Sequence, residues 1–510
     1  MNPATRESVR RLATGLAACI ALAPAAVAQG VADPLSPRLS IEEIAPPTVE
    51  AIGSELRLLA NTSSAVGLVG DQVAASIASS GVNGFVVWQD NAIDGNGLGI
   101  GARFLNLQTG ISSPQIVRVN QDSLLNQENP KVAALSNGGA VVVWQSGKVG
   151  HQSIRARLLS RTGGVSGNEI QIAQADASSG FYNPAVVPSG SGFVVAWEAA
   201  GPDGVSRKIH IQRFAANGAS DGVVRILGTS GRVDRRPTLA SHADGSVVVA
   251  WVAEMVQTDV LGLGGAATRS EVNSDIFAQI IQPGGQVGQL IWINGASRPC
   301  DAPAIAALSS GRTLIGWSEF ATDGTTGWDI RTAVIDASGT MPASPSTLNT
   351  YRSHEQLGLQ FGVSGNDALA VWNSRGADGS GLGASARALD QFGTPRGDEF
   401  VANSQRTADQ TDPAVAATPQ GFRVIWSSLG SLSTGIDLKA RDVKKLTGTS
   451  VRSIKLSWNS VPGEPYLLES STNLENWTTL QSVAAASSSQ QSISLDAASP
   501  TTFYRVKLAR

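Results

Sequence analysis

The stretch Gly138-Gly139-Ala140-Val141-Val142-Val143-Trp144 decides the fold of this chain, because relatives of it recur along most of the sequence. Seven tryptophans end these stretches, at intervals of 56, 53, 54, 66, 55 and 54 residues: Trp88, Trp144, Trp197, Trp251, Trp317, Trp372 and Trp426. A period of about 55 residues indicates supersecondary units that bury their apolar faces only by stacking on one another.

Each repeat contains four short apolar segments separated by Gly, Ser, Asn and Asp, which predicts four strands. The second strand, such as Gly192–Trp197, is apolar at consecutive positions. Such a pattern indicates burial on both faces, as in a sheet packed between two neighbouring sheets. The sequence therefore predicts an all-β fold, a seven-bladed β-propeller over residues 55–443.

The ends of the repeated region complement each other. Glu55–Leu59 matches the fourth strand of a repeat, whereas the last repeat stops after its third strand, Ile436–Asp442. We expect the N-terminal strand to complete the last sheet, because this pairs both exposed strand edges. The loops between second and third strands are long, and an insertion falls within Glu254–Asn273, so this long-loop face is where we expect binding.

Composition and targeting signals narrow the class of protein. The 510 residues are 42% hydrophobic and 15% charged with a net charge of -3, which argues against disorder and against nucleic-acid partners. Residues 1–28 combine early arginines with an apolar run ending in Ala26-Val27-Ala28, which predicts a signal peptide and a secreted, periplasmic or cell-surface protein. Cys19 also fits a lipoprotein box, so lipid anchoring stays open. No later apolar run reaches the ~20 residues of a membrane helix.

Two segments flank the repeats. Residues 29–54 are rich in proline and predict an N-terminal linker. Residues 447–510 alternate apolar and polar residues around Trp458 and Tyr466, which predicts a small β-sandwich whose further strand could come from Asp442–Leu446. Cys300 is left without a partner once the signal peptide is removed, and we interpret it as a buried apolar residue, with a reactive thiol as the alternative.

The candidate ligand-binding residues lie on the predicted long-loop face. Four aspartates each fall six residues after a repeat tryptophan and precede a glycine: Asp94, Asp203, Asp323 and Asp378. Turn formation explains this pattern, and a rim of carboxylates that binds a ligand or calcium is the alternative. Trp328 and Trp292 lie outside the repeat pattern and are candidates for exposed aromatic contacts. No catalytic nucleophile motif and no metal-ligand spacing is present in the sequence.

Arginines recur on the third strands, at Arg103, Arg157, Arg213, Arg387 and Arg441. Repetition of a cation in sheet after sheet indicates a structural tie to a carbonyl or carboxylate group.

Resemblances agree with this architecture. The Gly-Phe-Val-Val-Trp, Ile-x-Ala-Arg and Gln-x-Asn-Pro elements resemble a repeat of large secreted bacterial proteins of propeller type. The tail, with Leu456-Ser457-Trp458 and Phe503-Tyr504-Arg505-Val506, is similar to a fibronectin type III or immunoglobulin-like module of secreted bacterial proteins. The resemblance implies an extracellular accessory role and transfers no catalytic residue.

Three functional hypotheses follow. The main one is a non-catalytic binding or surface-interaction protein, monomeric, with a glycan or protein partner at the cell surface and no cofactor besides optional calcium. The alternatives are an extracellular carbohydrate-active enzyme with its site on the long-loop face, and a structural spacer. Paired carboxylates a few ångström apart at the channel mouth would favour the enzyme, whereas a rim of scattered polar residues without such a pair would favour binding.

Overall fold

The computed structural model is an all-β protein, and its described residues contain no helix. These residues are 39–44, 49–59, 70–109, 112–176, 178–203, 205–255, 273–321, 327–429, 435–445, 452–471, 476–484, 490–497 and 503–509. The predicted signal peptide and most of the predicted insertion in the fourth repeat lie outside them. The chain divides into two compact units, Met1–Thr48 with Thr447–Arg510, and Val49–Leu446.

The described part of Val49–Leu446 contains seven four-stranded antiparallel sheets. Their innermost strands are β3 (Gln72–Ser80), β7 (Asn126–Ala134), β11 (Phe181–Ser189), β15 (Arg232–Ser241), β19 (Ala304–Ala307), β23 (Gln356–Ser364) and β27 (Gln410–Thr418). The second strands, which contain the repeat tryptophans, are β4 (Asn83–Asp90), β8 (Ala140–Gly147), β12 (Gly192–Ala200), β16 (Val247–Met255), β20 (Thr313–Phe320), β24 (Asp367–Arg375) and β28 (Gly421–Leu429).

The outer half of each sheet completes the order. The third strands are β5 (Gly99–Asn106), β9 (Ser153–Leu159), β13 (Arg207–Phe214), β17 (Ser274–Ile281), β21 (Trp328–Ile335), β25 (Leu382–Asp390) and β29 (Ile436–Lys445). The outermost strands are β6 (Ser112–Arg118), β10 (Val165–Ala173), β14 (Ser220–Leu227), β18 (Ile291–Trp292), β22 (Ser346–Thr347), β26 (Pro395–Val401) and β2 (Val49–Arg57).

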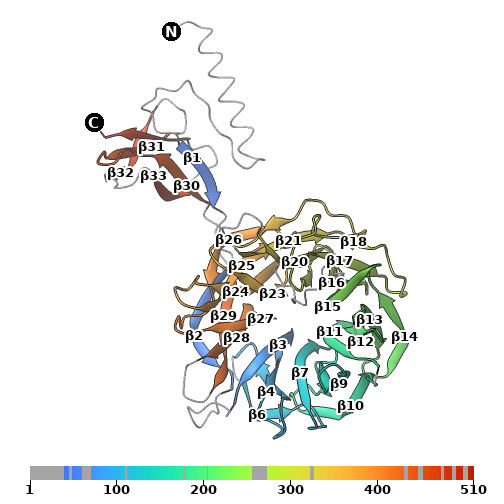
Figure 1. Cartoon of the computed structure of the whole chain (residues 1–510). Helices are drawn as coiled ribbons and strands as arrows, with labels where there is room; N and C mark the ends of the chain where they lie inside the picture. Colours follow the sequence, from blue (N-terminus) through green and yellow to red (C-terminus); the bar gives the residue numbers. More distant parts are fainter. Residues whose placement is uncertain are drawn as a thin grey trace, which may run out of the picture. The chain divides into compact units, whose positions relative to one another are not determined.

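The sheets are arranged around a common centre, with the innermost strands nearest to it (Figure 1). Each innermost strand contacts those of two neighbouring sheets, and β27 of the last sheet contacts β3 of the first. The all-β, propeller-like fold predicted from the sequence is confirmed. Because the strands are antiparallel, the short turns lie at one end of the sheets and the longer loops at the other.

The apolar packing explains why a single repeat cannot bury its own tryptophan. The seven repeat tryptophans are 0 or 1% exposed, as predicted. The apolar cluster around Trp88 of the first sheet also contains Leu58, Leu59, Ile425 and Leu438, which come from the last sheet and the residues that follow β2. Each tryptophan is thus buried by residues of a neighbouring sheet, and burial of this size is the main stabilising contribution of such a fold.

The arginines of the third strands tie neighbouring sheets together. Arg157 donates to the backbone oxygen of Val119 in the preceding sheet at 2.8 Å, and Arg387 donates in the same way to Leu348 at 2.6 Å. One predicted position differs. In the third sheet Gln212, and not Arg213, occupies the position that the arginine has in the other sheets, since Gln212 lies opposite Val195. Gln212 also donates a hydrogen bond to the backbone oxygen of Gly222 on the outermost strand.

The N-terminal strand β2 lies in the last sheet. It pairs antiparallel with β29, with Leu56 opposite Ala440. The side chain of Arg103 in the first sheet donates to the Leu58 backbone oxygen, which is the contact that Arg157 makes to Val119. The residues around β2 therefore take the place that an outermost strand has in the other sheets.

Glu55 on β2 strengthens this attachment. Its Oε1 atom accepts hydrogen bonds from the backbone of Ser404 at 2.5 Å and of Gln405 at 2.8 Å, and Lys439 lies 3.7 Å from Oε2. Desolvation raises the pKa of Glu55, but the backbone hydrogen bonds and Lys439 outweigh it and hold the pKa below its ordinary value of 4.5. The folded protein therefore favours the ionised carboxylate.

We expect Glu55 to make the stability of this unit depend on pH. A carboxyl with a depressed folded pKa contributes stability above its unfolded pKa, and this contribution is lost as the pH falls through the folded pKa. The unfolding midpoints of the wild type and of Glu55→Gln should therefore differ at pH 7 and converge as the pH falls through the folded pKa of Glu55. Glu50→Gln, on an exposed residue of the same strand, is the control and should leave the pH profile unchanged.

The described part of the other unit contains two three-stranded sheets. One consists of β1 (Leu39–Ile44), β30 (Arg452–Asn459) and β33 (Gln490–Ala497), and the other of β32 (Thr478–Val483), β31 (Tyr466–Ser471) and β34 (Phe503–Leu508). The rings of Trp458 and Tyr466 pack edge to face at 6.1 Å.

The prediction of a linker over residues 29–54 is therefore wrong in two stretches. Residues 39–44 form β1, which pairs with β30, and residues 49–54 belong to β2. The further strand beside β30 comes from β1 and not from Asp442–Leu446, because β29 already pairs on both sides within its own sheet. Prolines nearby suggested a tether, but each short segment gains strand partners that the local sequence does not reveal.

The part of the chain that the structure describes offers no helix with the length and hydropathy needed to cross a bilayer.

Candidate functional site

Two of the aspartates predicted to bind a ligand accept hydrogen bonds from asparagines of their own sheets. Asp94 Oδ2 accepts a hydrogen bond from Asn120 Nδ2 at 2.8 Å, and Asp378 Oδ2 accepts one from Asn403 Nδ2 at 2.9 Å. Each asparagine also accepts a backbone N–H of the neighbouring third strand, as Asn403 does from Ala384 at 2.8 Å. These carboxylates connect a loop to the end of an outermost strand, which is a structural role.

Asp203 shapes an exposed turn. Its Oδ1 atom accepts the hydroxyl and the backbone N–H of Ser206 at 2.7 and 2.9 Å and the Val205 N–H at 3.0 Å. The hydrogen bonds from Ser206 lower the pKa of Asp203. Asp323 lies outside the described residues. The structure thus favours the turn interpretation for the three described aspartates and does not bring them together.

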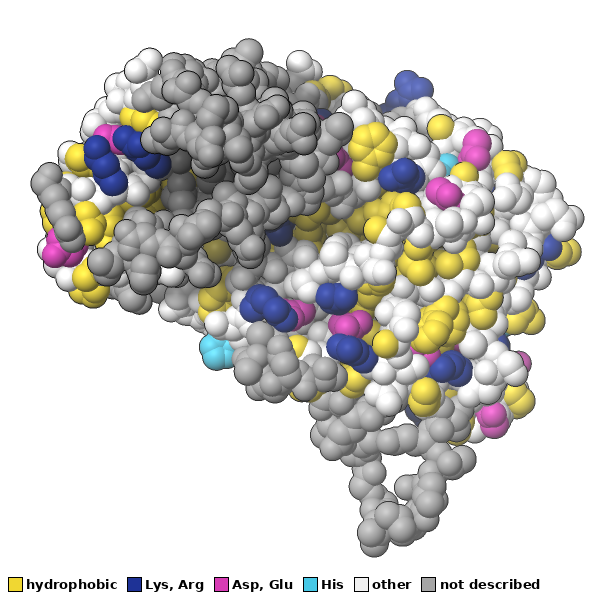
Figure 2. All heavy atoms as spheres, turned by 90° about the horizontal axis from the view of Figure 1, so that it is seen from above, with side chains coloured by type: hydrophobic (Ala, Val, Ile, Leu, Met, Phe, Trp, Pro, Cys, Tyr) yellow, Lys and Arg dark blue, Asp and Glu magenta, His cyan; other side chains and the backbone are white. Residues whose placement is uncertain are grey.

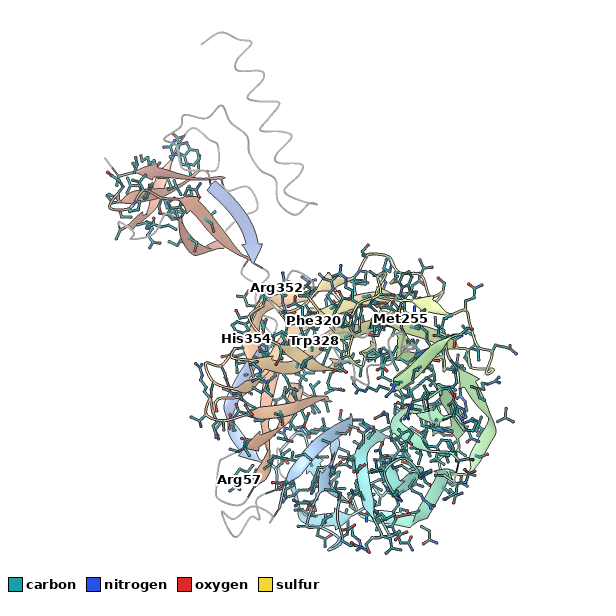
Figure 3. All side chains as sticks on the ribbon, in the orientation of Figure 1. Arg57, Met255, Phe320, Trp328, Arg352 and His354 are labelled. Atoms are coloured by element: carbon teal, nitrogen blue, oxygen red, sulfur yellow. The ribbon has the colours of Figure 1, made fainter. Side chains whose placement is uncertain are left out.

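The two tryptophans outside the repeat differ. Trp328 is only 8% exposed and packs edge to face on Phe320 at 5.6 Å, so its ring is not an open contact surface and that prediction is wrong. Figure 3 shows the two rings in the same part of the ring of sheets, where Arg352 also bonds Asp329 at 2.6 Å. Trp292 is 46% exposed, and its indole N–H donates to Asp275.

Polar side chains collect instead at the innermost strands, where six of the seven are interrupted at the same place. Each has a register shift near its beginning, on the long-loop side. The residue there has a positive φ in every case: Ala74 (51°), Asn129 (53°), Asn183 (49°), Arg236 (53°), Gly358 (70°) and Asp412 (52°). A left-handed non-glycine residue costs about 1–3 kcal/mol, and such strain is concentrated at functional sites.

Side chains next to the repeat tryptophans hold these bulges. The residues after the first three tryptophans reach the next sheet. Gln89 Oε1 accepts the Asn129 N–H at 3.2 Å, Gln145 Oε1 the Asn183 N–H at 3.1 Å and Glu198 Oε2 the Arg236 N–H at 3.3 Å. Asn129 Nδ2 also donates to Asn183 Oδ1 at 3.1 Å. Neighbouring bulges are therefore linked through side chains around the centre.

Charged groups extend this arrangement. The Glu198 side chain is only 2% exposed. Its carboxylate accepts a hydrogen bond from Arg207 Nη1 at 2.7 Å and another from Asn183 Nδ2 at 2.9 Å. Arg236 Nη1 donates to Asp301 Oδ1 at 2.5 Å. Two carboxylates thus lie on either side of Arg236, one bonded to its backbone and one to its guanidinium group.

Lys131 and Asp412 form a second pair of charged side chains at the innermost strands. They lie on β7 and β27 and interact across β3, whose Ala74 backbone N–H also bonds the Asp412 carboxylate. Asp412 is an exposed residue. Desolvation of its carboxylate by the protein nevertheless raises its pKa, and Lys131 offsets this only in part. Desolvation likewise lowers the pKa of Lys131. Opposite shifts in one acid–base pair are typical of functional sites.

We call this group the axial polar cluster. Its members share a place at or beside the bulges of the innermost strands, and they are Asn129, Lys131, Asn183, Glu198, Arg236, Asp301 and Asp412. The sequence hypotheses did not include it. A usable signal was present, because Asn129, Asn183, Arg236 and Asp412 each directly precede a proline near the start of an innermost strand.

Neither the free cysteine nor the metal-ligating residue types add a candidate site among the described residues. Cys300 is free and buried, and burial together with the nearby Glu319 carboxylate raises the pKa of its thiol, so it is not a nucleophile in this state. Among the described residues, no group of three or more His, Cys, Asp or Glu side chains could hold a metal ion. Figure 2 shows basic and acidic side chains intermixed on the visible face.

The comparisons with known proteins concern the fold. No protein-family model matches the chain, and no curated protein does. A solved protein of unknown function from Dyadobacter fermentans is 12% identical, with 64% of this chain and 97% of that chain covered and a TM-score of 0.45. An α-L-arabinanase of Penicillium chrysogenum is 11% identical (62% and 93% covered, TM-score 0.39), and a polysaccharide lyase 9% (80% and 99%, TM-score 0.44).

These comparisons correct the main functional hypothesis from the sequence. The similar structures that carry an activity in their description are mostly carbohydrate-active enzymes, including arabinofuranosidases. The interpretation as a non-catalytic binding or surface-interaction protein is therefore not retained. At such low identity no residue role is transferred, so the enzymatic alternative has to rest on the residues of this chain.

Proposed function

We propose that this protein is a secreted glycoside hydrolase whose site is the axial polar cluster on the long-loop face. In this proposal the seven sheets are the blades of a β-propeller that β2 closes, residues 1–28 are a signal peptide, and the C-terminal residues form an accessory fibronectin- or immunoglobulin-like module. The observation that carries the proposal is the place of Asp412 at the bulge of β27, where its carboxylate faces Lys131 and the Ala74 N–H and has a raised pKa.

Glycoside hydrolysis requires a protonated carboxylic acid and an ionised carboxylate with different environments. Asp412 fits the acid, because desolvation favours its neutral form and the proton can pass to the leaving oxygen. Glu198 and Asp301 fit the second carboxylate, because Arg207 and Arg236 bond them at 2.7 and 2.5 Å. Their negative charge would stabilise the positive charge that develops on the sugar ring.

The remaining members fit substrate binding. The amide groups of Asn129 and Asn183 can donate to and accept from sugar hydroxyl groups. The bulges aim these side chains from neighbouring strands, and strain of this kind is retained where the surrounding structure fixes a functional geometry. The raised pKa of Asp412 beside Lys131 favours catalysis over a spacer role.

The first test compares Asp412→Asn with the wild type, as purified residues 29–510, on a panel of neutral and acidic polysaccharides. We expect kcat for the release of reducing ends to fall by about 10²–10⁴-fold, because the proton donor is lost. In the wild type, kcat/KM should fall as the pH rises through the elevated pKa of Asp412. Asp336→Asn removes a half-buried turn carboxylate at the short-turn end and is the control, with activity near that of the wild type.

Two outcomes would contradict the proposal. One is a folded wild type that releases no reducing ends from any polysaccharide. The other is a product that absorbs as an unsaturated uronate, because that indicates elimination and not hydrolysis.

A further inference from the structure

A cavity of about 270 Å³ lies at the junction of the last and first sheets, near the short-turn end. We call it the seam cavity. The closing strand β2, the turn after β5, and strands β28 and β29 with the turn before β28 supply its lining: Ile52, Leu56, Leu107–Thr109, Thr418, Gln420, Arg423 and Asp442–Lys444. None of these residues belongs to the axial polar cluster.

Arg423 is the unusual residue in this lining. It is 1% exposed, and its Nε and Nη2 atoms each donate to the Asp442 carboxylate at 2.8 Å. Its Nη1 atom is buried and has no hydrogen-bond partner among the described residues. A buried, unpaired donor is costly, since the desolvation penalty is not recovered. The missing partner is therefore an acceptor that the described residues do not supply.

The other sheets show that the fold does not need this arginine. Three residues before each remaining repeat tryptophan, the sequence has an apolar residue: Phe85, Val141, Val194, Val248, Leu314 and Leu369. Arg423 lies directly opposite Asp442, where the fifth sheet pairs Leu314 with Val334. The Arg423 side chain is buried but that of Asp442 is 37% exposed. Apolar residues would stabilise this position at least as well as such an ion pair, so the pair points to a different role.

The lining also indicates the chemistry of the ligand. Arg423 and Asp442 neutralise each other, and Lys444 at the exposed edge leaves one positive charge. Ile52, Leu56 and Leu107 add apolar surface. We propose that the seam cavity binds a small molecule through an oxyanion group, a carboxylate or a phosphate, which accepts from the Arg423 guanidinium.

Binding there should favour attachment of β2. The ligand would contact Ile52 and Leu56 of β2 together with residues of the first sheet, so it binds only when β2 is in place. A ligand that binds the folded form alone raises its stability with concentration. The site thus couples a small anion to the integrity of the ring, independently of any activity at the centre.

The test is the thermal midpoint of the full chain titrated with inorganic phosphate or with butyrate, at constant ionic strength set by sodium chloride. We expect a saturable rise with at least one anion at millimolar concentration. A response to phosphate alone identifies a phosphate ligand, and a response to butyrate alone an organic acid. Amide exchange in β2 should slow in parallel.

The matched variant is Arg423→Leu combined with Asp442→Val, which creates the pair found in the fifth sheet. We expect it to fold and to lose the saturable response, whereas Arg161→Gln, on an exposed cation of another short turn, should keep it. An equal rise in the wild type and the double variant, or no rise with either anion, would overturn the proposal. If the double variant does not fold, Lys444→Gln decides, since an unchanged apparent Kd would also overturn it.

Discussion

Deleting residues 1–59 is expected to destabilise the large unit by on the order of 5 kcal/mol or more, which is comparable to the whole stability of a typical domain. The deletion removes β2 and leaves the outer edge of β29 unpaired. It also removes Leu58 and Leu59, which are 3% and 2% exposed, and each buried leucine contributes about 1.5–3 kcal/mol. Arg103 loses its Leu58 carbonyl partner as well.

Thermal or urea unfolding monitored by tryptophan fluorescence measures this effect. A synthetic peptide of residues 49–59 should restore part of the lost midpoint when added in trans, because it can pair with β29. A matched deletion of residues 1–38 keeps β1 and β2 and is the control. An unchanged midpoint after removal of residues 1–59 would show that β2 is not needed to hold the last and first sheets together.

Trp197→Ala is expected to cost about 3–5 kcal/mol of unfolding free energy, as truncation of a buried aromatic residue does. The ring is 1% exposed and packs on His210 with a centroid distance of 5.8 Å. Its loss leaves a cavity between two sheets, which can close only in part because strands on both sides are fixed by backbone pairing. The measurement is the urea unfolding midpoint at neutral pH.

Phenylalanine variants separate ring packing from hydrogen bonding. The indole N–H of Trp197 has no partner among the described residues, whereas that of Trp88 donates to Asp90 at 3.0 Å. Trp88→Phe should therefore cost about 1–3 kcal/mol more than Trp197→Phe, because it leaves a buried carboxylate oxygen short of a donor. Equal costs for the two variants would contradict this explanation.

Much of the fold was predictable because it is periodic. Tryptophans at the ends of consecutive apolar runs indicated sheets buried on both faces, and all seven are buried. A spare outermost strand at the start and a missing one at the end pointed to pairing across the whole repeat region, and β2 pairs with β29. Periodicity was less informative where a repeat departs from the pattern. For that reason the sequence pattern indicated Arg213 at the repeated arginine position, which Gln212 occupies.

The candidate site was not predicted, since repetition drew attention to the wrong groups. Asp94 and Asp378 recur because the same loop needs the same hydrogen bond to an asparagine. Lys131 and Asp412 are single residues on distant repeats, and nothing in their local sequence shows that β7 and β27 approach each other across β3. Local sequence also could not show that Trp328 would be covered by Phe320.

The sequence by itself determined the strand content, the number of repeats and the buried aromatic of each sheet, because these depend on local patterns of apolar and turn-forming residues. Only the tertiary structure decided which polar groups meet. Asp412 and Lys131 interact although they lie in the last and second repeats, and the unpaired Arg423 N–H lies where the last sheet meets the first. Both depend on long-range packing, which no local pattern encodes.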